Sequence, residues 1–376
     1  MAVTTPQNKP SGREGAADEE GQALAQRRIE RGRLVVAGCA GLMVVAVTLG
    51  LALGPVAISP WDQILILLHG LGFVGEGAVD PVKVAVMEAI RTPRVVLGAA
   101  AGAALGLAGA TLQGFFRNPL ADPGLIGVSS GGAVAAVAVI VLGANFLGGW
   151  VLAFGPYALP IASFLGSLLA VALIYRVALR EGQVIVATML LAGVAANALA
   201  FAGIGYLTFL ADDAQLRTLT FWTLGSLGGA TWPSILPAIT IIAIAIAGLW
   251  RLQRPLNCLL FGEADARYLG VAVESAKRRA ALFTALGVGA ATAVCGLISF
   301  VGLVTPHLVR LVAGPDHRYV LPGAAFLGAA PLVLSDLIAR LVVQPAELPV
   351  GVVTALIGAP FFFWLLIRDK RRGTLG

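Results

Sequence analysis

The sequence predicts an all-α integral membrane protein with about ten transmembrane helices, a short re-entrant half-helix and short helices in its cytoplasmic loops. Of its 376 residues, 58% are hydrophobic and 12% are charged, whereas a soluble protein of this length carries about a quarter charged residues. Apolar runs of about 20 residues, the length that crosses a bilayer, recur along the chain. Lys and Arg cluster in alternate loops between these runs, which is typical of loops on the cytoplasmic side.

The chain divides into a polar N-terminal tail and one membrane domain. Residues 1–33 are rich in Gly, Ala, Glu and Gln, so we expect a flexible or loosely helical cytoplasmic tail. It contains no short apolar core followed by a small-residue cleavage site, so we do not expect a signal peptide. Residues 34–376 form the membrane domain. Its first apolar run, 34–56, is preceded by four cations that place this end in the cytoplasm, namely Arg27, Arg28, Arg31 and Arg33.

The remaining spans are expected between turns that contain glycine and proline. The segment 57–91 is amphipathic and is expected to lie outside the membrane. The apolar piece 218–227 is too short to cross and is bounded by glycines, so it predicts a half-helix that dips into a polar cavity. Further spans are expected at 94–116, 128–147, 157–179, 186–209, 235–249, 280–297, 300–312, 321–343 and 349–367.

The distribution of cations tests this layout. Both ends of the chain carry Lys and Arg clusters, so both termini should be cytoplasmic and the number of spans even. All but five of the 26 Lys and Arg residues then fall on the cytoplasmic side, and the five are Lys83, Arg91, Arg94, Arg217 and Arg340. A layout shifted by one span would destroy this imbalance.

Small residues recur at every fourth position of the span 94–116. Gly98, Gly102, Gly106 and Ala110 make one smooth helix face. Such a face lets a neighbouring helix approach closely, and we prefer this packing interpretation to a hinge.

A basic loop at 250–281 separates two apolar blocks and carries six Lys and Arg residues. Within it, 262–270 has the pattern of a short helix closed by a glycine at each end. A structured polar loop of this kind predicts a docking surface for a cytoplasmic partner. The residues that we expect to form it are Gly262, Glu263, Ala264, Arg267, Leu269 and Gly270.

The sequence has no nucleotide site and no catalytic or metal motif. A Walker A loop requires Gly-Lys-Ser/Thr, and none of the four lysines, Lys9, Lys83, Lys277 and Lys370, follows a glycine. Residues 127–131 match Gly-x-Ser-x-Gly, but at the mouth of an apolar helix rather than in the strand-to-helix turn of a hydrolase. We therefore expect no enzyme activity and no bound metal, and ATP would act only through another chain.

Three arginines on the cation-poor outer side have two interpretations. Arg91 and Arg94 flank the start of one span, and Arg340 ends another, four residues after Asp336. They either extend to the interface, with an i, i+4 ion pair between Asp336 and Arg340, or form a receptor for carboxylates of an external partner.

Four motifs resemble a known family of membrane proteins. They are RTPR at 91–94, QGFFRNPLADPGLIG at 113–127, FVGLVTPH at 300–307 and ELPVGVVTALIGAP at 347–360. The chain is similar in these motifs to the FecCD-type permeases of ATP-binding-cassette importers, which carry vitamin B12, haem or ferric siderophores. The resemblance extends from about residue 34 to the C-terminus.

The resemblance implies partners, a location and a gate. It implies a homodimer with a central pore in the bacterial inner membrane, with two cytoplasmic ATPase subunits docked on the 262–270 region. A periplasmic binding protein would deliver cargo at Arg91, Arg94 and Arg340. The family's cytoplasmic gate corresponds to Val186 and Ala187. The vitamin B12 permease has small hydroxyl residues there, and this chain does not.

The cargo implied by the resemblance is haem, because 211–232 is most similar to the haem branch. Candidate pathway residues are Asn197, Phe209, Phe221 and Trp222, whose aromatic members suit a flat apolar macrocycle or simple packing. No cofactor is expected to stay bound; Mg-ATP belongs to the ATPase subunits. The alternatives are a ferric siderophore or vitamin B12 as cargo, or an ion-coupled secondary transporter. The last needs acids inside the membrane, and Asp336 is the only carboxylate well inside a proposed span.

Overall fold

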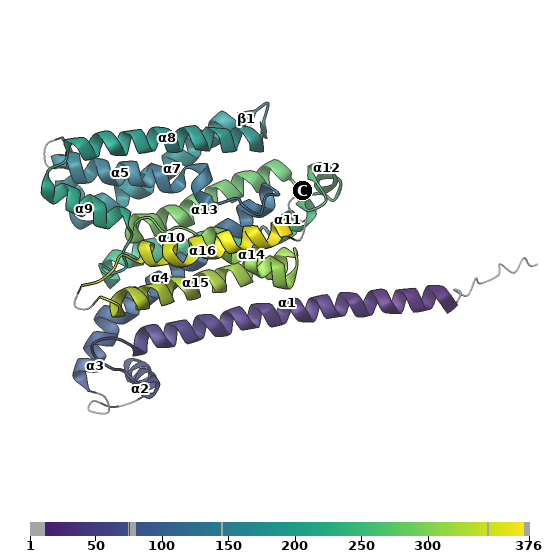
Figure 1. Ribbon diagram of the computed structural model, residues 1–376, viewed down its shortest axis with the longest axis horizontal. Coiled ribbons are helices and arrows are strands. Elements are labelled where there is room, and N and C mark those ends of the chain that lie inside the picture. Colours follow the sequence, from purple (N-terminus) through teal and green to yellow (C-terminus); the bar gives the residue numbers. More distant parts are fainter. Residues whose placement is uncertain (1–11, 74, 76–79, 144–145, 344–345, 372–376) are drawn as a thin grey trace, which may run out of the picture.

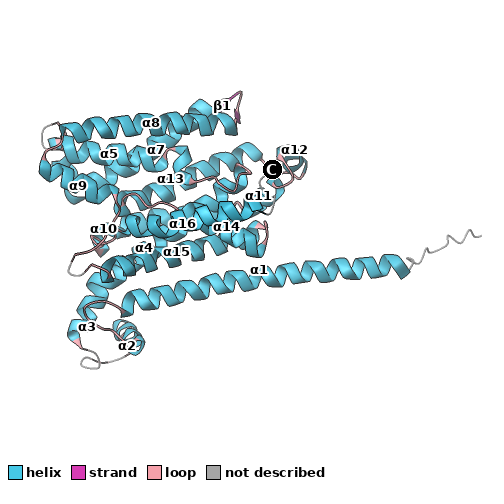
Figure 2. Cartoon of the chain, viewed as in Figure 1, coloured by secondary structure: helices cyan, strands magenta, loops and turns pink. Residues whose placement is uncertain are grey.

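The computed structural model describes residues 12–73, 75, 80–143, 146–343 and 346–371. Those residues form a bundle of roughly parallel helices joined by short loops, as Figure 2 shows. A small antiparallel hairpin, β1–β2, pairs Leu179 with Val184 and Arg180 with Gln183. The elements are α1 (Gly12–Ala52), α2 (Pro60–Gly70), α3 (Pro81–Val86), the π-helix η1 (Met87–Arg91), α4 (Thr92–Phe115), the 3₁₀-helix η2 (Pro123–Ile126), α5 (Val128–Leu142), α6 (Gly148–Phe154), the 3₁₀-helix η3 (Gly155–Tyr157), α7 (Ala158–Ala178), β1 (Leu179–Arg180), β2 (Gln183–Val184), α8 (Val186–Leu210), α9 (Asp213–Thr223), α10 (Trp232–Trp250), α11 (Gln253–Leu259), α12 (Glu263–Tyr268), α13 (Val273–Cys295), α14 (Val301–Ala313), α15 (His317–Leu341) and α16 (Val350–Arg371).

The two ends of the bundle carry different elements. α1 begins and α16 ends at one end, where α11, α12 and the β1–β2 hairpin also lie (Figure 1). α2, α3 and α9 lie at the opposite end. We call these the α12 end and the α9 end. The return of the chain to the end at which α1 begins agrees with the even number of spans expected from the charges.

The helices confirm the predicted spans. Among the described residues, six stretches are long and apolar enough to cross a bilayer, and Val128–Leu142, Val301–Ala313 and Val350–Trp364 form shorter apolar helices. α13 covers the remaining predicted span but begins earlier, at Val273, with a charged first turn. Each of the ten predicted spans therefore corresponds to a helix.

α1 and α9 also differ in extent from the expectation. α1 runs without interruption from Gly12, so residues 12–33 are helical, and residues 1–11 of the predicted tail lie outside the described residues. The predicted half-helix is α9, which begins five residues earlier because Asp212 and Gln215 form a capping box. It ends at Thr223, ahead of Gly225, whose φ of +73° leaves the helical region.

α4 is the central helix of the bundle, and it packs against α10, α13, α14 and α15. Its small residues allow backbone contact, as the four-residue spacing predicts. A Cβ added at Gly102 would lie 2.3 Å from Gly328 O, and one added at Gly106 would lie 2.1 Å from Ala324 O, both on α15. α15 therefore approaches α4 as closely as two helices without side chains between them can.

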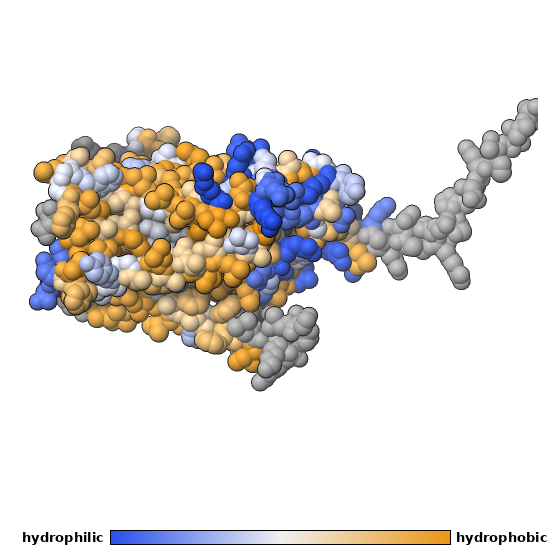
Figure 3. Space-filling model, turned by 90° about the horizontal axis from the view of Figure 1, so that it is seen from above, coloured by the Kyte–Doolittle hydropathy of each residue, from blue (hydrophilic) through white to orange (hydrophobic). Residues whose placement is uncertain are grey.

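The lateral surface of the bundle is apolar. Figure 3 shows hydrophobic residues along the side and hydrophilic residues gathered at the α12 end. α8 contributes large exposed side chains to this surface, among them Leu191, Leu199 and Phe201. An apolar wall between polar ends is what a bilayer or a second membrane subunit covers.

Candidate functional site

The short helix expected at 262–270 is present as α12. Gly262 precedes it with φ of +119° and Gly270 follows it with φ of +80°, which are conformations that favour glycine. Within the helix Ala266 is buried, while Tyr268 and, just before the helix, Phe261 are 91% and 72% exposed. Exposed aromatic residues beside charges are typical of a surface that another protein covers. These two aromatics were not among the residues expected from the sequence.

The other predicted docking residues lie on the same short helix. Ala264 is exposed, and Leu269 is 53% exposed. Glu263 and Arg267 instead pair with each other at 3.7 Å, and each also pairs with a residue of α13. The predicted set therefore divides into an outward-facing part and a part that contacts the rest of the bundle.

Four charged residues from α12 and α13 form one network, which we call the Lys277 cluster: Glu263, Arg267, Glu274 and Lys277. Lys277 Nζ lies 2.8 Å from Glu263 Oε1 and 3.4 Å from Glu274 Oε1. Arg267 Nη2 lies 3.5 Å from Glu274 Oε1. The Lys277 side chain is 7% exposed, whereas that of Arg267 is 47% exposed. The i, i+3 spacing of Glu274 and Lys277 was visible in the sequence, but their common partners were not.

The candidate gate residues begin α8. Val186 is half-buried and Ala187 is exposed, directly after the β1–β2 hairpin. Val184, the last residue of that hairpin, is 5% exposed. Its N–H donates to Glu274 Oε2 over 2.9 Å, and its carbonyl accepts from Lys277 Nζ over 3.1 Å. The start of α8 is thus joined to the Lys277 cluster, which links two sites that the sequence treated separately.

The four candidate pathway residues do not converge on one point. The Asn197 amide accepts from Ser130 Oγ at 2.5 Å and donates to Gly124 O at 3.1 Å, so it faces α5 and the loop before it. Twelve residues, or about 18 Å of helix, separate it from Phe209, which is 84% exposed. Phe221 is 56% exposed on α9, and the adjacent Trp222 is half-buried.

Arg91 and Arg340 hold the C-terminal end of α1. Arg91 Nη1 donates to the carbonyls of Leu51 and Ala52 over 2.6 and 2.9 Å, and Arg340 Nη2 donates to Gly50 O over 3.0 Å. The last carbonyls of a helix have no partner within it, and a cation there also interacts favourably with the negative end of the helix dipole. These two guanidinium groups therefore cap the C-terminal end of α1.

Arg94 occupies the centre of a buried ion network at the α9 end. Its Nη2 lies 2.8 Å from Asp336 Oδ1 and 3.0 Å from Glu347 Oε2, and its side chain is 7% exposed. Asp336 is 2% exposed and also pairs with Arg340 at 3.2 Å. The predicted i, i+4 pair is thus present. An ion-coupled mechanism needs a carboxylate that binds the coupling ion. Asp336 instead pairs with two arginines, which argues against that role.

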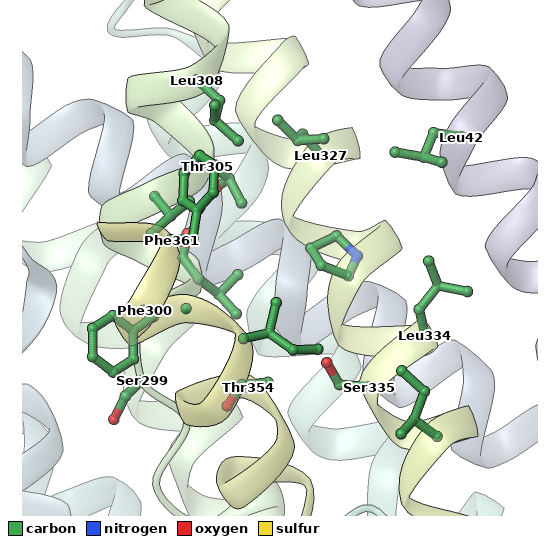
Figure 4. Close-up of a pocket in the computed structure, with 16 residues that line it drawn as sticks. Leu42, Ser299, Phe300, Thr305, Leu308, Leu327, Leu334, Ser335, Thr354 and Phe361 are labelled. Atoms are coloured by element: carbon green, nitrogen blue, oxygen red, sulfur yellow. The ribbon is translucent and has the colours of Figure 1, made fainter. Parts of the chain in front are cut away.

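A cavity of about 350 Å³ opens among α1, α14, α15 and α16. Its lining is largely apolar, and Figure 4 shows Phe300, Phe361, Leu327 and Leu42 around it, with the hydroxyl of Ser335 on α15. None of the candidate pathway residues lines this cavity. It is therefore separate from the route that the sequence suggested.

Comparison with known proteins agrees with this architecture. The FecCD transport family matches residues 42–368. The hemin transport system permease protein HmuU of Yersinia pestis is 45% identical over 293 residues, which are 75% of this chain and 83% of that protein. The cobalamin import system permease protein BtuC of Halobacterium salinarum is 44% identical over 285 residues, which are 76% and 74% of the two chains.

A solved structure supports the same assignment. It holds an inward-facing ABC transporter assigned to the metal-chelate type, with a TM-score of 0.76 and 28% sequence identity over 89% of this chain and 99% of that one. The family match, the two permeases and the shared fold agree with the motifs at 91–94, 113–127, 300–307 and 347–360. This chain therefore belongs to the FecCD transport family and is the permease of an ABC importer.

Proposed function

We propose that this permease moves haem across the bacterial inner membrane into the cytoplasm, driven by ATP hydrolysis in separate subunits. The observation that supports haem as the cargo is the 45% identity to the hemin permease of Yersinia pestis. Exposed Phe209 and Phe221, at 84% and 56%, support it because a flat apolar macrocycle stacks well on aromatic rings. Haem is cargo rather than a resident cofactor, and Mg-ATP belongs to the ATPase subunits.

Cobalamin import is the second candidate, favoured by the 44% identity to the cobalamin permease of Halobacterium salinarum. The same machine with a ferric siderophore as cargo is the third. The three candidate functions share the fold and the kinds of partner. They differ in the shape and polarity of the cargo that would pass along α8 and α9.

The proposed assembly contains two copies of this chain, two ATPase subunits and one periplasmic binding protein. The exposed apolar face of α8, including Leu191 and Leu199, supports contact with a second copy across a central pore. The exposed Phe261 and Tyr268 around α12 support docking of the ATPase subunits at that end. We expect both chain termini on the same, cytoplasmic side.

A reconstituted system tests the cargo. Proteoliposomes that contain the permease, its ATPase subunits and its binding protein should accumulate haem with ATP, at least about tenfold faster than cobalamin. The permease alone is the matched control and should neither hydrolyse ATP nor accumulate cargo. Faster cobalamin uptake would favour the second candidate, and ATP-independent uptake by the chain alone would favour an ion-coupled transporter.

The binding protein should dock at Arg91, Arg94 and Arg340, and Glu347 offers a test that leaves the buried contacts of Asp336 with Arg94 and Arg340 in place. Glu347 pairs with Arg94 but is 46% exposed, against 2% for Asp336. A partner carboxylate that binds Arg94 must therefore compete with Glu347. We expect Glu347→Gln to tighten binding-protein association by about threefold to tenfold, the effect of one exposed charge pair, as measured by surface plasmon resonance at two salt concentrations.

The matched control is Asp213→Asn, which removes an exposed carboxylate at the same end without touching the arginines. It should change the affinity much less than Glu347→Gln. Unchanged or weaker binding by Glu347→Gln would place the partner away from Arg94.

A further inference from the structure

The hairpin that precedes α8 is fastened to α13 through both backbone polar groups of one residue. Val184 N–H donates to Glu274 and Val184 O accepts from Lys277, over 2.9 and 3.1 Å. Both side chains come from the first two turns of α13. Hydrogen bonds to charged groups are about twice as strong as neutral ones, so the backbone two residues before Val186 follows α13 closely.

Lys277 is fastened to α12 as well. Its Nζ lies 2.8 Å from the carboxylate of Glu263, the first residue of α12. An ammonium that is 7% exposed needs its oxygen partners, because a buried charge that loses one is costly. One atom therefore joins α12, α13 and the hairpin. Arg267, by contrast, pairs with Glu263 and Glu274 and makes no ion pair with the hairpin among the described residues.

The space around this junction leaves little freedom. A cavity of only about 20 Å³ lies beside Lys277 and the first turn of α8, lined by Val184, Val186 and Met189 together with residues of α4, α7 and α13. That volume holds about one water molecule. Little free space is therefore present between Lys277 and Val186 to absorb a displacement of Lys277.

We propose that Lys277 is a positioning residue that relays movement of α12 to the start of α8. Lys277 Nζ forms an ion pair with Glu263 and donates a hydrogen bond to the carbonyl of Val184. Displacement of α12 by a docked ATPase therefore moves Val186 and Ala187 through these two contacts. The relay rests on the proposed function, because it assumes that the ATPase subunits dock at α12. It places coupling in an ion pair inside the permease rather than only at the docking surface.

Lys277→Met is the test variant. It removes the ammonium and keeps most of the aliphatic stem. Because Arg267 can still pair with Glu263 and Glu274, we expect the fold to be retained. Arg180→Met is the matched control. It removes an exposed cation from the same hairpin, and Arg180 makes no ion pair in the described part of the chain.

The first measurement is hydrogen–deuterium exchange of the permease assembled with its ATPase subunits, with and without ATP. In wild type and in Arg180→Met, nucleotide should change exchange in peptides covering both 260–272 and 179–190. In Lys277→Met the change at 260–272 should persist, while that at 179–190 falls to less than about a third. A uniformly loosened protein would not separate the two segments in this way.

The second measurement is uptake per ATP hydrolysed. We expect Lys277→Met to lower it about tenfold while ATP hydrolysis continues, and Glu263→Gln to lower it less. The double variant should be no worse than Lys277→Met alone, because both changes break one chain of contacts.

The outcomes separate the relay from the function on which it rests. An unchanged response at 179–190 in Lys277→Met, or additive losses in the double variant, overturns the relay alone. A wild-type complex with no response at 260–272 contradicts docking of the ATPase at α12, and the relay then fails with it.

Discussion

Replacing Asp336 by asparagine is expected to lower the free energy of unfolding by about 3 kcal/mol. Asp336 is the shared counter-charge of Arg94 and Arg340, at 2.8 and 3.2 Å. Asparagine keeps the size of the side chain but leaves the two guanidinium groups facing each other across a buried site. Removing one partner of a buried ion pair costs about 3–5 kcal/mol. The lower value applies because Arg94 retains Glu347.

Unfolding in detergent, followed by circular dichroism or by the accessibility of buried cysteines, measures this loss. The matched control is again Asp213→Asn, whose carboxylate is exposed, and which should change the free energy of unfolding by no more than about 0.5 kcal/mol. A loss below about 1 kcal/mol for Asp336→Asn would mean that the network is hydrated and that the arginines are free to serve an external partner.

The positions of the spans were predictable because they depend on local composition. Apolar runs near the length of a bilayer crossing, together with the cation imbalance between alternate loops, are properties of contiguous sequence. The same holds for α12, whose flanking Gly262 and Gly270 mark both of its ends. At α9 the boundary moved because of a side-chain cap: Asp212 starts the helix before the apolar run begins.

The partners of the three arginines were predictable from the sequence only in part, namely for the pair of Asp336 and Arg340. Arg94 pairs with residues more than 240 positions away, and only the packing of α15 beside α4 brings them together. Arg91 and Arg340 were expected either to extend to the interface or to receive an external partner, and nothing in the sequence indicated that they also donate to carbonyls at the end of α1. A docking role for these arginines therefore requires a carboxylate of the binding protein to replace one of their present partners. Glu347 is the exposed partner of Arg94, and it is therefore the residue changed in the proposed test.

The Lys277 cluster was missed for a related reason. The sequence showed a basic loop, and a cation in a loop is usually solvated. The burial of Lys277 depends on the hairpin of residues 179–184 folding onto α13, and no local pattern predicts that contact. The sequence identified Glu263 and Val186 for different reasons, and the structure connects them through one side chain.

Replacing Gly109 by alanine is expected to destabilise the bundle by about 3 kcal/mol or more, because the added methyl group meets backbone rather than a movable side chain. A Cβ at Gly109 would lie 1.7 Å from Gly302 O and 2.6 Å from Gly302 C. α4 and α14 must then move apart, which opens contacts along both helices. Overpacking a core costs about 1–3 kcal/mol where side chains can adjust, and here they cannot.

Gly41→Ala on α1 is the matched control for Gly109→Ala, since it makes the same chemical change where a Cβ meets nothing within 4 Å. It should be neutral or stabilise the protein by up to about 1 kcal/mol through helix propensity. Thermal unfolding midpoints of the two variants, purified in the same detergent, should therefore move in opposite directions or differ clearly. Equal midpoints would mean that α14 yields without cost. In that case the glycines of α4 would not mark a close-packed contact, and the hinge interpretation that was set aside for them would be favoured.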